Sequence, residues 1–356
     1  MSFQEEKRES IKRYMLEKIR QDDAGFVQKT MENFGISVTT VKRYIKECLA
    51  AAMIEEDLVA ASGYSLICSE HMWTYRIDRR LTEDKVFFQD IRPQLQNVSK
   101  EAYAIWSYIF MEIMNNAIEH SEGQTICYRI RQDYLYTEIS VTDDGIGIFR
   151  KIRRFLSEQM GVEADVQDAI LELYKGKFTT DTSAHSGEGI FFSSKMMREF
   201  AIWSEDAVFT YGCYEGEKLV QSHLLSYYAR LQRIGTMVVM KLENQTKRKP
   251  KEVFDMYAPV EKGFVHTVIP VKEVCPYGEP IARSQARRIL YRLEEFEKVE
   301  FDFAGVEFMG QGFADEVFRV FQNRHPEIEL IAVNANETVS GMVKHVRVNL
   351  KQMAGK

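Results

Sequence analysis

The sequence YIFMEIMNNAIEHS at residues 108–121 carries apolar side chains three or four positions apart, a spacing that predicts a helix. Glu112 and Asn116 are four residues apart and therefore share one face of that helix. Mg²⁺ prefers oxygen ligands and keeps several waters, so one amide oxygen can serve as its protein ligand. A carboxylate beside that amide can orient or deprotonate an attacking water. We therefore expect this helix to carry a metal ligand and a general base.

A second motif, TEISVTDDGIGI at residues 137–148, alternates like a strand and ends in Asp143, Gly145 and Gly147. A carboxylate at a strand end can accept a hydrogen bond from an exocyclic amine. The two glycines are expected to let a flat ring approach the backbone closely. This strand end is therefore a candidate site for a flat ring that bears an amine.

Two further motifs complete the set. HSGEGIFFSSKM at residues 185–196 places Gly187 and Gly189 before an apolar helix, where free N–H groups and the helix dipole make an anion site. RIGTMVVMKLE at residues 233–243 opens a strand near Thr236, whose hydroxyl can reach a bound base directly or through water. Each motif is common by itself, whereas the four in this order are specific. The sequence contains no GxxxxGK[ST] phosphate loop.

The four motifs together resemble those of the GHKL ATPase family, which includes type II topoisomerases, ninety-kilodalton heat-shock chaperones, sensor histidine kinases and mismatch-repair ATPases. The resemblance covers about residues 81–243 and implies an α/β sandwich that binds ATP and Mg²⁺. By resemblance, Asn116 ligates Mg²⁺, Asp143 accepts the adenine amine, and Glu112 is the general base of the hydrolysing branches. The other nucleotide-binding residues that it implies are Gly145, Gly147, Lys177, Gly187, Gly189 and Thr236.

Residues 149–186 correspond, in the same resemblance, to a lid over the nucleotide. Its side chains that could touch the phosphates are Lys175, Lys177, Thr179, Thr180 and His185. The motifs leave open whether ATP is hydrolysed or only bound. A sensor histidine kinase is disfavoured, because no helix pair for dimerisation and phosphotransfer precedes the motifs.

Residues 1–80 carry the pattern of a helix-turn-helix domain, with two short helices joined at Gly35 and Ser37 as a candidate N-cap. Hydroxyls and cations at the front of the second helix suit base edges and phosphates in a major groove. The candidate DNA-binding residues are Thr39, Thr40, Lys42 and Arg43. The stretch at residues 64–77 is a candidate hairpin wing. The alternative is a small helical interaction domain, which the surrounding acidic residues favour.

The hydrophilic run NQTKRKPK at residues 244–251 predicts a linker between a central domain at 81–248 and a C-terminal domain at 253–356. Helices and strands alternate in the latter, which favours a small α/β domain. The stretch VEFDFAGVEFMGQGFADEVF at residues 299–318 resembles the STAS fold of anti-sigma factor antagonists, in particular a STAS-like domain of unknown function found behind GHKL domains in bacteria and archaea. In the antagonists a serine at the turn accepts phosphate, whereas this turn reads Gly310-Gln311-Gly312, so phosphorylation in cis is not expected. A purely structural or docking role is the alternative.

Composition excludes several classes of protein. The 356 residues carry a net charge of −6, which argues against a uniformly basic nucleic-acid coat. No apolar run approaches the roughly 18 residues of a membrane span. The five cysteines are isolated and odd in number, which indicates neither a disulfide framework nor a zinc knuckle and favours the cytoplasm.

The whole chain is thus expected to be a multidomain α/β regulator of prokaryotic type, with a winged helix-turn-helix, a GHKL sandwich and a STAS-like domain. Three functions fit. The first is an ATP-controlled DNA-binding transcriptional regulator with Mg-dependent ATPase activity. The second is an anti-sigma-type serine protein kinase that acts on a separate STAS partner. The third is a nucleotide-gated protein-interaction scaffold without turnover. Helix-turn-helix proteins often read paired half-sites, which favours a homodimer.

Overall fold

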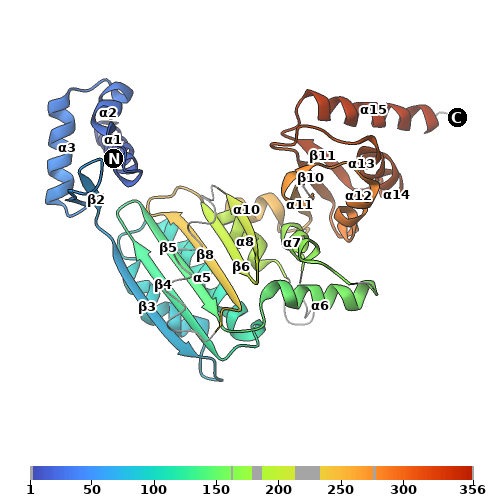
Figure 1. Cartoon of the computed structure of the whole chain (residues 1–356), viewed down its shortest axis with the longest axis horizontal. Coiled ribbons are helices and arrows are strands. Elements are labelled where there is room, and N and C mark those ends of the chain that lie inside the picture. The colour runs from blue at the N-terminus through green and yellow to red at the C-terminus, as the bar shows by residue number, and fades with distance from the viewer. Residues whose placement is uncertain (1–2, 162, 179–186, 213–232, 276–277, 355–356) are drawn as a thin grey trace.

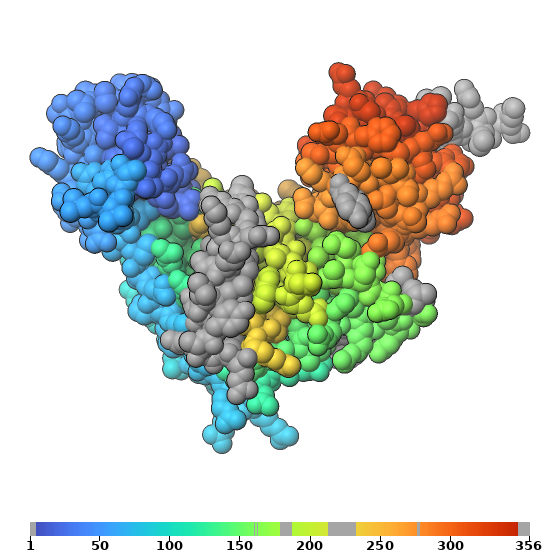
Figure 2. Space-filling view, viewed as in Figure 1, coloured from blue at the N-terminus to red at the C-terminus, as the bar shows by residue number. Residues whose placement is uncertain are grey.

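The computed structural model describes residues 3–161, 163–178, 187–212, 233–275 and 278–354 (Figure 1). A helical N-terminal part and an α/β C-terminal part lie at opposite ends of a central sheet. Figure 2 shows these two parts as separate lobes that stand on the central part with an open gap between them on this face. The mixed architecture confirms the predicted multidomain α/β class.

The N-terminal part contains three helices followed by a two-stranded antiparallel hairpin: α1 (Phe3–Arg20), α2 (Phe26–Phe34), α3 (Val38–Ala50), β1 (Ile54–Glu56) and β2 (Tyr64–Leu66). Gly35 ends α2 in the left-handed conformation, with φ of 61°. The Ser37 hydroxyl accepts the backbone N–H of Thr40 and so caps α3 as expected. The apolar faces of the helices enclose a small core around Met15, Val41 and Ile45.

The expected hairpin wing at residues 64–77 is wrong. β2 pairs with β1, whereas the following strand, β3 (Ser69–Arg76), pairs along its whole length with β4 (Thr125–Gln132) of the central sheet. The local alternation predicts a strand at these residues, but it does not specify the partner strand. The central sheet therefore begins at Ser69, before the predicted boundary at residue 81.

The central sheet has six antiparallel strands in the order β3-β4-β5-β8-β6-β7. Its remaining strands are β5 (Tyr136–Asp143), β6 (Glu199–Ser204), β7 (Ala207–Gly212) and β8 (Thr236–Glu243). β5 is buried along its whole length, because it lies inside the sheet and is covered by helices. α5 (Lys100–His120) and α8 (Gly189–Met196) pack against the sheet and against each other (Figure 1). The motif helix and the motif strand are thus adjacent, as a sandwich requires.

The other helical segments of the central part are α4 (Glu83–Val86), η1 (Phe87–Ile91), η2 (Arg92–Gln94), α6 (Ile148–Met160) and α7 (Val166–Lys175). α6 begins directly after Gly147, and α7 packs against α6. Asp165 and Asp168 form a capping box at the start of α7, which fixes where that helix begins. α6 and α7 thereby connect the end of β5 to the C-terminal part.

The C-terminal part is built on three parallel strands in the order β11-β10-β9. Its elements are α10 (Pro250–Tyr257), β9 (His266–Pro270), α11 (Val271–Val274), α12 (Arg283–Leu290), η4 (Leu293–Glu295), β10 (Lys298–Asp302), α13 (Gln311–Asp315), η5 (Glu316–Phe321), α14 (Gln322–Arg324), β11 (Glu329–Val333) and α15 (Glu337–Ala354). The buried apolar residues of this part join those of the central part in one continuous cluster. The two parts therefore share part of one apolar core.

Candidate functional site

One cavity of about 340 Å³ lies between α5, the end of β5, the start of β8, and the segment from α6 to α8. It gathers residues that are far apart in the sequence. Seven of the nine residues proposed for nucleotide, metal or catalysis line it, namely Glu112, Asn116, Asp143, Gly147, Gly187, Gly189 and Thr236. The two that do not line it are Gly145 and Lys177.

Asp143 forms the polar end of the cavity. Its Oδ1 accepts the backbone N–H groups of Gly145 at 2.8 Å and Thr236 at 3.3 Å. Among the described residues, its Oδ2 has no hydrogen-bond partner, and the side chain borders the cavity. Burial raises the pKa of Asp143 to about 7 although these two N–H groups oppose the rise. A buried carboxyl with one oxygen fixed and the other available suits an amine donor from a ligand.

Gly145 lies outside the cavity lining. A Cβ at this position would lie 2.0 Å from the carbonyl oxygen of Ser121, at the end of α5. The next residue, Ile146, donates its N–H to that same carbonyl at 2.9 Å. The close approach of the backbone after β5 to the end of α5 is therefore sufficient to require glycine here, and the contact of Gly145 with a ring stays a prediction. Gly147 does line the cavity, and it adopts a φ of +92°, which residues other than glycine rarely adopt.

Thr236 makes a hydrogen bond within the protein and also borders the cavity. Its hydroxyl oxygen accepts the N–H of Ile148 at 2.9 Å and so satisfies a free donor at the start of α6. A hydroxyl that accepts one bond can still donate its own hydrogen elsewhere. Thr236 is therefore able to donate to a ligand atom or to a water beside Asp143.

Glu112 lies against the start of α8. A Cβ on Gly189 would be 2.2 Å from Glu112 Oε2, so only glycine permits this approach. The first N–H groups of a helix have no partner within the helix, and its dipole puts partial positive charge there, so the start of α8 favours negative charge. Asn116 lines the cavity one turn further along α5. The acid, the amide and the candidate anion site are therefore neighbours.

The lid residues are placed differently from the expectation. Lys177 Nζ donates to the carbonyl of Glu295 at 2.5 Å and lies 4.5 Å from the ring centroid of Phe296, both in the C-terminal part. Lys175 is buried and pairs with Glu172 at 2.7 Å. The structure thus directs both lysines away from the cavity. Thr179, Thr180 and His185 lie outside the described residues.

Two charged residues of the cavity wall were missed by the sequence analysis. Lys151 lies on α6, one turn after Gly147, and its Nζ donates to the carbonyl of His120 at 2.9 Å. Glu172 lies on α7. A helix predicted to begin at residue 148 would have placed Lys151 in its first turn, close to Gly147. No local sequence pattern indicates that Glu172 lines the cavity. Among the described lining residues, the charged side chains are three carboxylates and Lys151, with His120 as a further titratable group.

The candidate DNA-binding residues lie on α3, in the N-terminal part. Thr39, Lys42 and Arg43 are exposed, and Thr40 is half-buried beside the Ser37 cap. Residues 3–67 contain ten lysines and arginines against eleven aspartates and glutamates, so no net positive charge attracts DNA to this part as a whole. A role in DNA binding would therefore depend on the local face of α3.

The described residues contain no group of three or more His, Cys, Asp or Glu side chains arranged to hold a metal ion. No helix within that same part of the chain is long and apolar enough to cross a membrane.

Comparison with known families agrees with the two α/β parts. Residues 105–224 match the family of histidine kinase-, DNA gyrase B- and HSP90-like ATPases. Residues 285–340 match a STAS-like domain of unknown function. Neither match reaches the N-terminal helices, and no curated protein matches the chain. The first match supports ATP binding. The chain therefore carries a GHKL-type ATPase domain followed by a STAS-like domain.

Proposed function

We propose that this protein is an ATP-controlled regulator that binds Mg-ATP in the cavity and DNA through α3. The observation that carries the nucleotide part is the convergence of Glu112, Asn116, Asp143, Gly189 and Thr236 on one cavity. A different arrangement of the same motifs, with these residues around separate cavities, would have left them without a common ligand. The match to GHKL-type ATPases supports the same conclusion.

The charge of the cavity explains why the nucleotide would enter with Mg²⁺. Three carboxylates and one lysine line its described part, so a bare triphosphate meets net repulsion. Asn116 offers the amide oxygen that a hard cation accepts, and the phosphates and waters supply the other ligands. When bound, the ion neutralises phosphate charge next to Glu112.

Different groups of the protein then bind the base, the phosphates and the attacking water. Asp143 Oδ2 accepts the adenine amine while Oδ1 stays bound to the backbone, and Thr236 donates beside it. Gly187, Gly189 and the start of α8 hold the phosphates with backbone N–H groups. Glu112 lies at the same helix start and takes the proton of the attacking water.

Titration of the purified full chain with Mg-ATP, followed by measurement of phosphate release, tests this function. Saturable binding that requires Mg²⁺ supports the nucleotide site, and phosphate release shows turnover. Binding without release would support the scaffold instead. Absence of ATP binding would contradict the proposal as a whole.

The affinity for adenine nucleotides should rise with pH through about 7. The pKa of Asp143 is raised to about 7 by burial, so its carboxylate fraction grows from about a tenth at pH 6 to about nine tenths at pH 8. Only the carboxylate accepts the amine, so binding should strengthen up to about tenfold over this interval. Calorimetric titration at pH 6, 7 and 8 checks it. Adenosine, which has no phosphates to titrate, should show the same rise, and a flat adenosine profile would exclude Asp143 as its cause.

Substitution of Lys42 and Arg43 by alanine should weaken DNA binding uniformly across sequences. Both side chains are exposed on α3, and loss of two phosphate contacts lowers the affinity about 10- to 100-fold and flattens its salt dependence. Gel-shift titrations with and without Mg-ATP measure this effect. Lys29→Ala is the matched control, because Lys29 is an exposed lysine of the same part that lies on α2 and pairs with Asp23. DNA affinity that is absent in both nucleotide states would contradict the DNA-binding role.

A serine protein kinase remains the second candidate, because a STAS-like domain follows the ATPase domain in the same chain. The turn at Gly310-Gln311-Gly312 has no hydroxyl, so the acceptor would belong to a separate STAS protein. Transfer of labelled γ-phosphate to such a partner would favour the kinase, whereas release of free phosphate alone would favour the ATPase.

A further inference from the structure

α7 lies between the cavity and the STAS-like domain. Glu172 and Leu173 of this helix line the cavity, and Gly176 and Phe178 line it just beyond the helix end. The same helix meets the C-terminal part through contacts with β9 and α11. α7 is therefore a structural link between the cavity wall and the C-terminal part.

Ion pairs hold α7 to the STAS-like domain along one face. Arg288 on α12 pairs with Asp165 and Asp168, each at 2.9 Å. Arg292 pairs with Glu172 at 3.1 Å. Since Glu172 also lines the cavity, this residue belongs to both the domain contact and the cavity wall.

Lys175 completes this contact from the ATPase side. Its Nζ binds Glu172 at 2.7 Å and donates to the carbonyl of Tyr291 at 2.6 Å. The hydroxyl of Thr267 on β9 donates to the carbonyl of Lys175 at 2.9 Å. The last turn of α7 is thus bound to two segments of the C-terminal part, and Glu172 of the same turn lines the cavity.

Arg292 holds its position at a conformational cost. Its φ is +61° and its ψ is 15°, a left-handed conformation that few residues other than glycine adopt. It lies between α12 and η4, and its guanidinium also donates to the carbonyl of Lys177 at 3.3 Å. Such strain persists only where the surrounding contacts impose it. The contacts that Arg292 makes here are those with α7 and the segment that follows it, together with an ion pair to Glu295 at 2.9 Å within its own domain.

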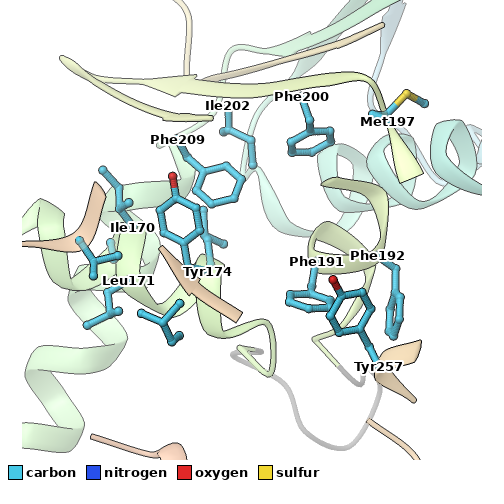
Figure 3. Packing of buried hydrophobic residues seen from close by; sticks show 14 of the residues in the cluster. Ile170, Leu171, Tyr174, Phe191, Phe192, Met197, Phe200, Ile202, Phe209 and Tyr257 are labelled. Carbon is cyan, nitrogen blue, oxygen red and sulfur yellow. The ribbon is translucent and has the colours of Figure 1, made fainter. Parts of the chain in front are cut away.

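An apolar contact runs beside the ion pairs. Phe191 of α8 lines the cavity, and its ring centroid lies 4.6 Å from that of Phe264 and 5.1 Å from that of Tyr257. Figure 3 shows Phe191 and Tyr257 next to each other, and Tyr174 of α7 packed against Phe209 of β7. A Cβ on Gly176 would lie 2.4 Å from the Phe191 ring, so the end of α7 lies directly against this ring.

We propose that the STAS-like domain controls nucleotide binding by holding α7, with Glu172 as the residue that the two sites share. This inference rests on the proposed nucleotide function. While the domains are docked, Arg292 and Lys175 compensate the charge of Glu172, and a polyphosphate can lie near it. When Arg292 leaves, an under-compensated carboxylate faces the phosphates. Docking and nucleotide binding therefore favour each other, and by linkage a ligand or protein that displaces the STAS-like domain lowers the ATP affinity.

Arg292→Met in the full chain should weaken Mg-ATP binding about fivefold or more and leave adenosine binding unchanged, because only the phosphates meet the exposed charge. Arg287→Met is the matched control. Arg287, on α12, likewise has a glutamate partner, Glu316 at 2.9 Å, but that pair lies within the STAS-like domain. The control should bind both ligands like the parent protein, and Arg292→Lys should recover part of the ATP affinity.

Hydrogen exchange provides a second measurement that does not depend on the size of the affinity change. Mg-ATP should slow exchange at residues 283–297 of the parent protein, although they lie outside the cavity lining, and Arg292→Met should abolish that slowing. Equal ATP affinities of the parent and Arg292→Met, or an equal loss for ATP and adenosine, would overturn the inference alone. Absence of ATP binding to the parent protein would instead show that the proposed function has failed, and the inference with it.

Discussion

An Asp143→Asn variant should lose ATP binding by about 100-fold or more, or about 3 kcal/mol. Asparagine has the shape of aspartate, and its oxygen can still accept the N–H of Gly145. Its NH₂ group then occupies the place of Oδ2. Because this group and the adenine amine are both hydrogen-bond donors, they cannot bond to each other. The variant therefore loses a charge-assisted hydrogen bond and leaves a buried donor unpaired. Calorimetric titration of parent and variant with Mg-ATP measures the loss.

Asp144→Asn is the control for this experiment. Asp144 is the next residue, and its Oδ1 accepts the N–H groups of Gln124 at 2.7 Å and Thr125 at 2.9 Å outside the cavity lining. The control should bind ATP like the parent protein. Thermal melting without nucleotide should show that Asp143→Asn remains folded, because a neutral amide avoids the cost of burying a charge at this position. Unchanged ATP affinity of folded Asp143→Asn would remove Asp143 from the site.

The site could be predicted from the sequence where short-range geometry decides it. Glu112 and Asn116 share a face because they are one helical turn apart, and Asp143 comes at a strand end because the alternation stops there. Both features follow from local periodicity, and the structure brings them to one cavity. The predicted roles of these residues stay predictions until they are measured.

Local pattern fails where a partner comes from a distant segment. β3 was expected in a hairpin with β2, but it pairs with β4, whose residues are 49 to 63 positions further along the chain. The close approach of Gly145 to the carbonyl of Ser121 is a contact that no motif indicates. The contact of Arg292 with Glu172 joins residues 120 positions apart. Charge and helical spacing on α7 and α12 show that each helix has a polar face, but not that the two faces meet.

The same limitation applies to the lid. A lysine in a lid segment is expected to reach phosphates, and the resemblance assigned Lys177 that role. In the structure its ammonium group lies over Phe296 and bonds the carbonyl of Glu295, so the STAS-like domain takes up this cation. The lysine that does line the cavity is Lys151, on the helix that follows Gly147. A prediction made from the ATPase motifs alone could not include contacts of their lysines with another domain.

A Glu112→Gln variant should lose phosphate release by about 100- to 10,000-fold while it keeps or gains ATP affinity. Glutamine can hold a water by hydrogen bonds but cannot take its proton. The carboxylate of Glu112 lies at the start of α8, where the phosphates are proposed to bind, so removal of its charge relieves repulsion. Phosphate-release kinetics under saturating Mg-ATP, together with calorimetric titration, separate the two effects.

Glu119→Gln tests whether the loss is specific to the cavity. Glu119 lies on the same helix seven residues later, is exposed, accepts the amide of Asn115 at 3.2 Å and does not line the cavity. It should hydrolyse ATP like the parent protein. If Glu112→Gln released phosphate at the parent rate, the base would have to be another group, and Glu172 would be the remaining lining carboxylate besides Asp143 in the described part of the chain. Lys175 and Arg292 already bind the two carboxylate oxygens of Glu172, which leaves Glu112 as the better candidate for proton transfer.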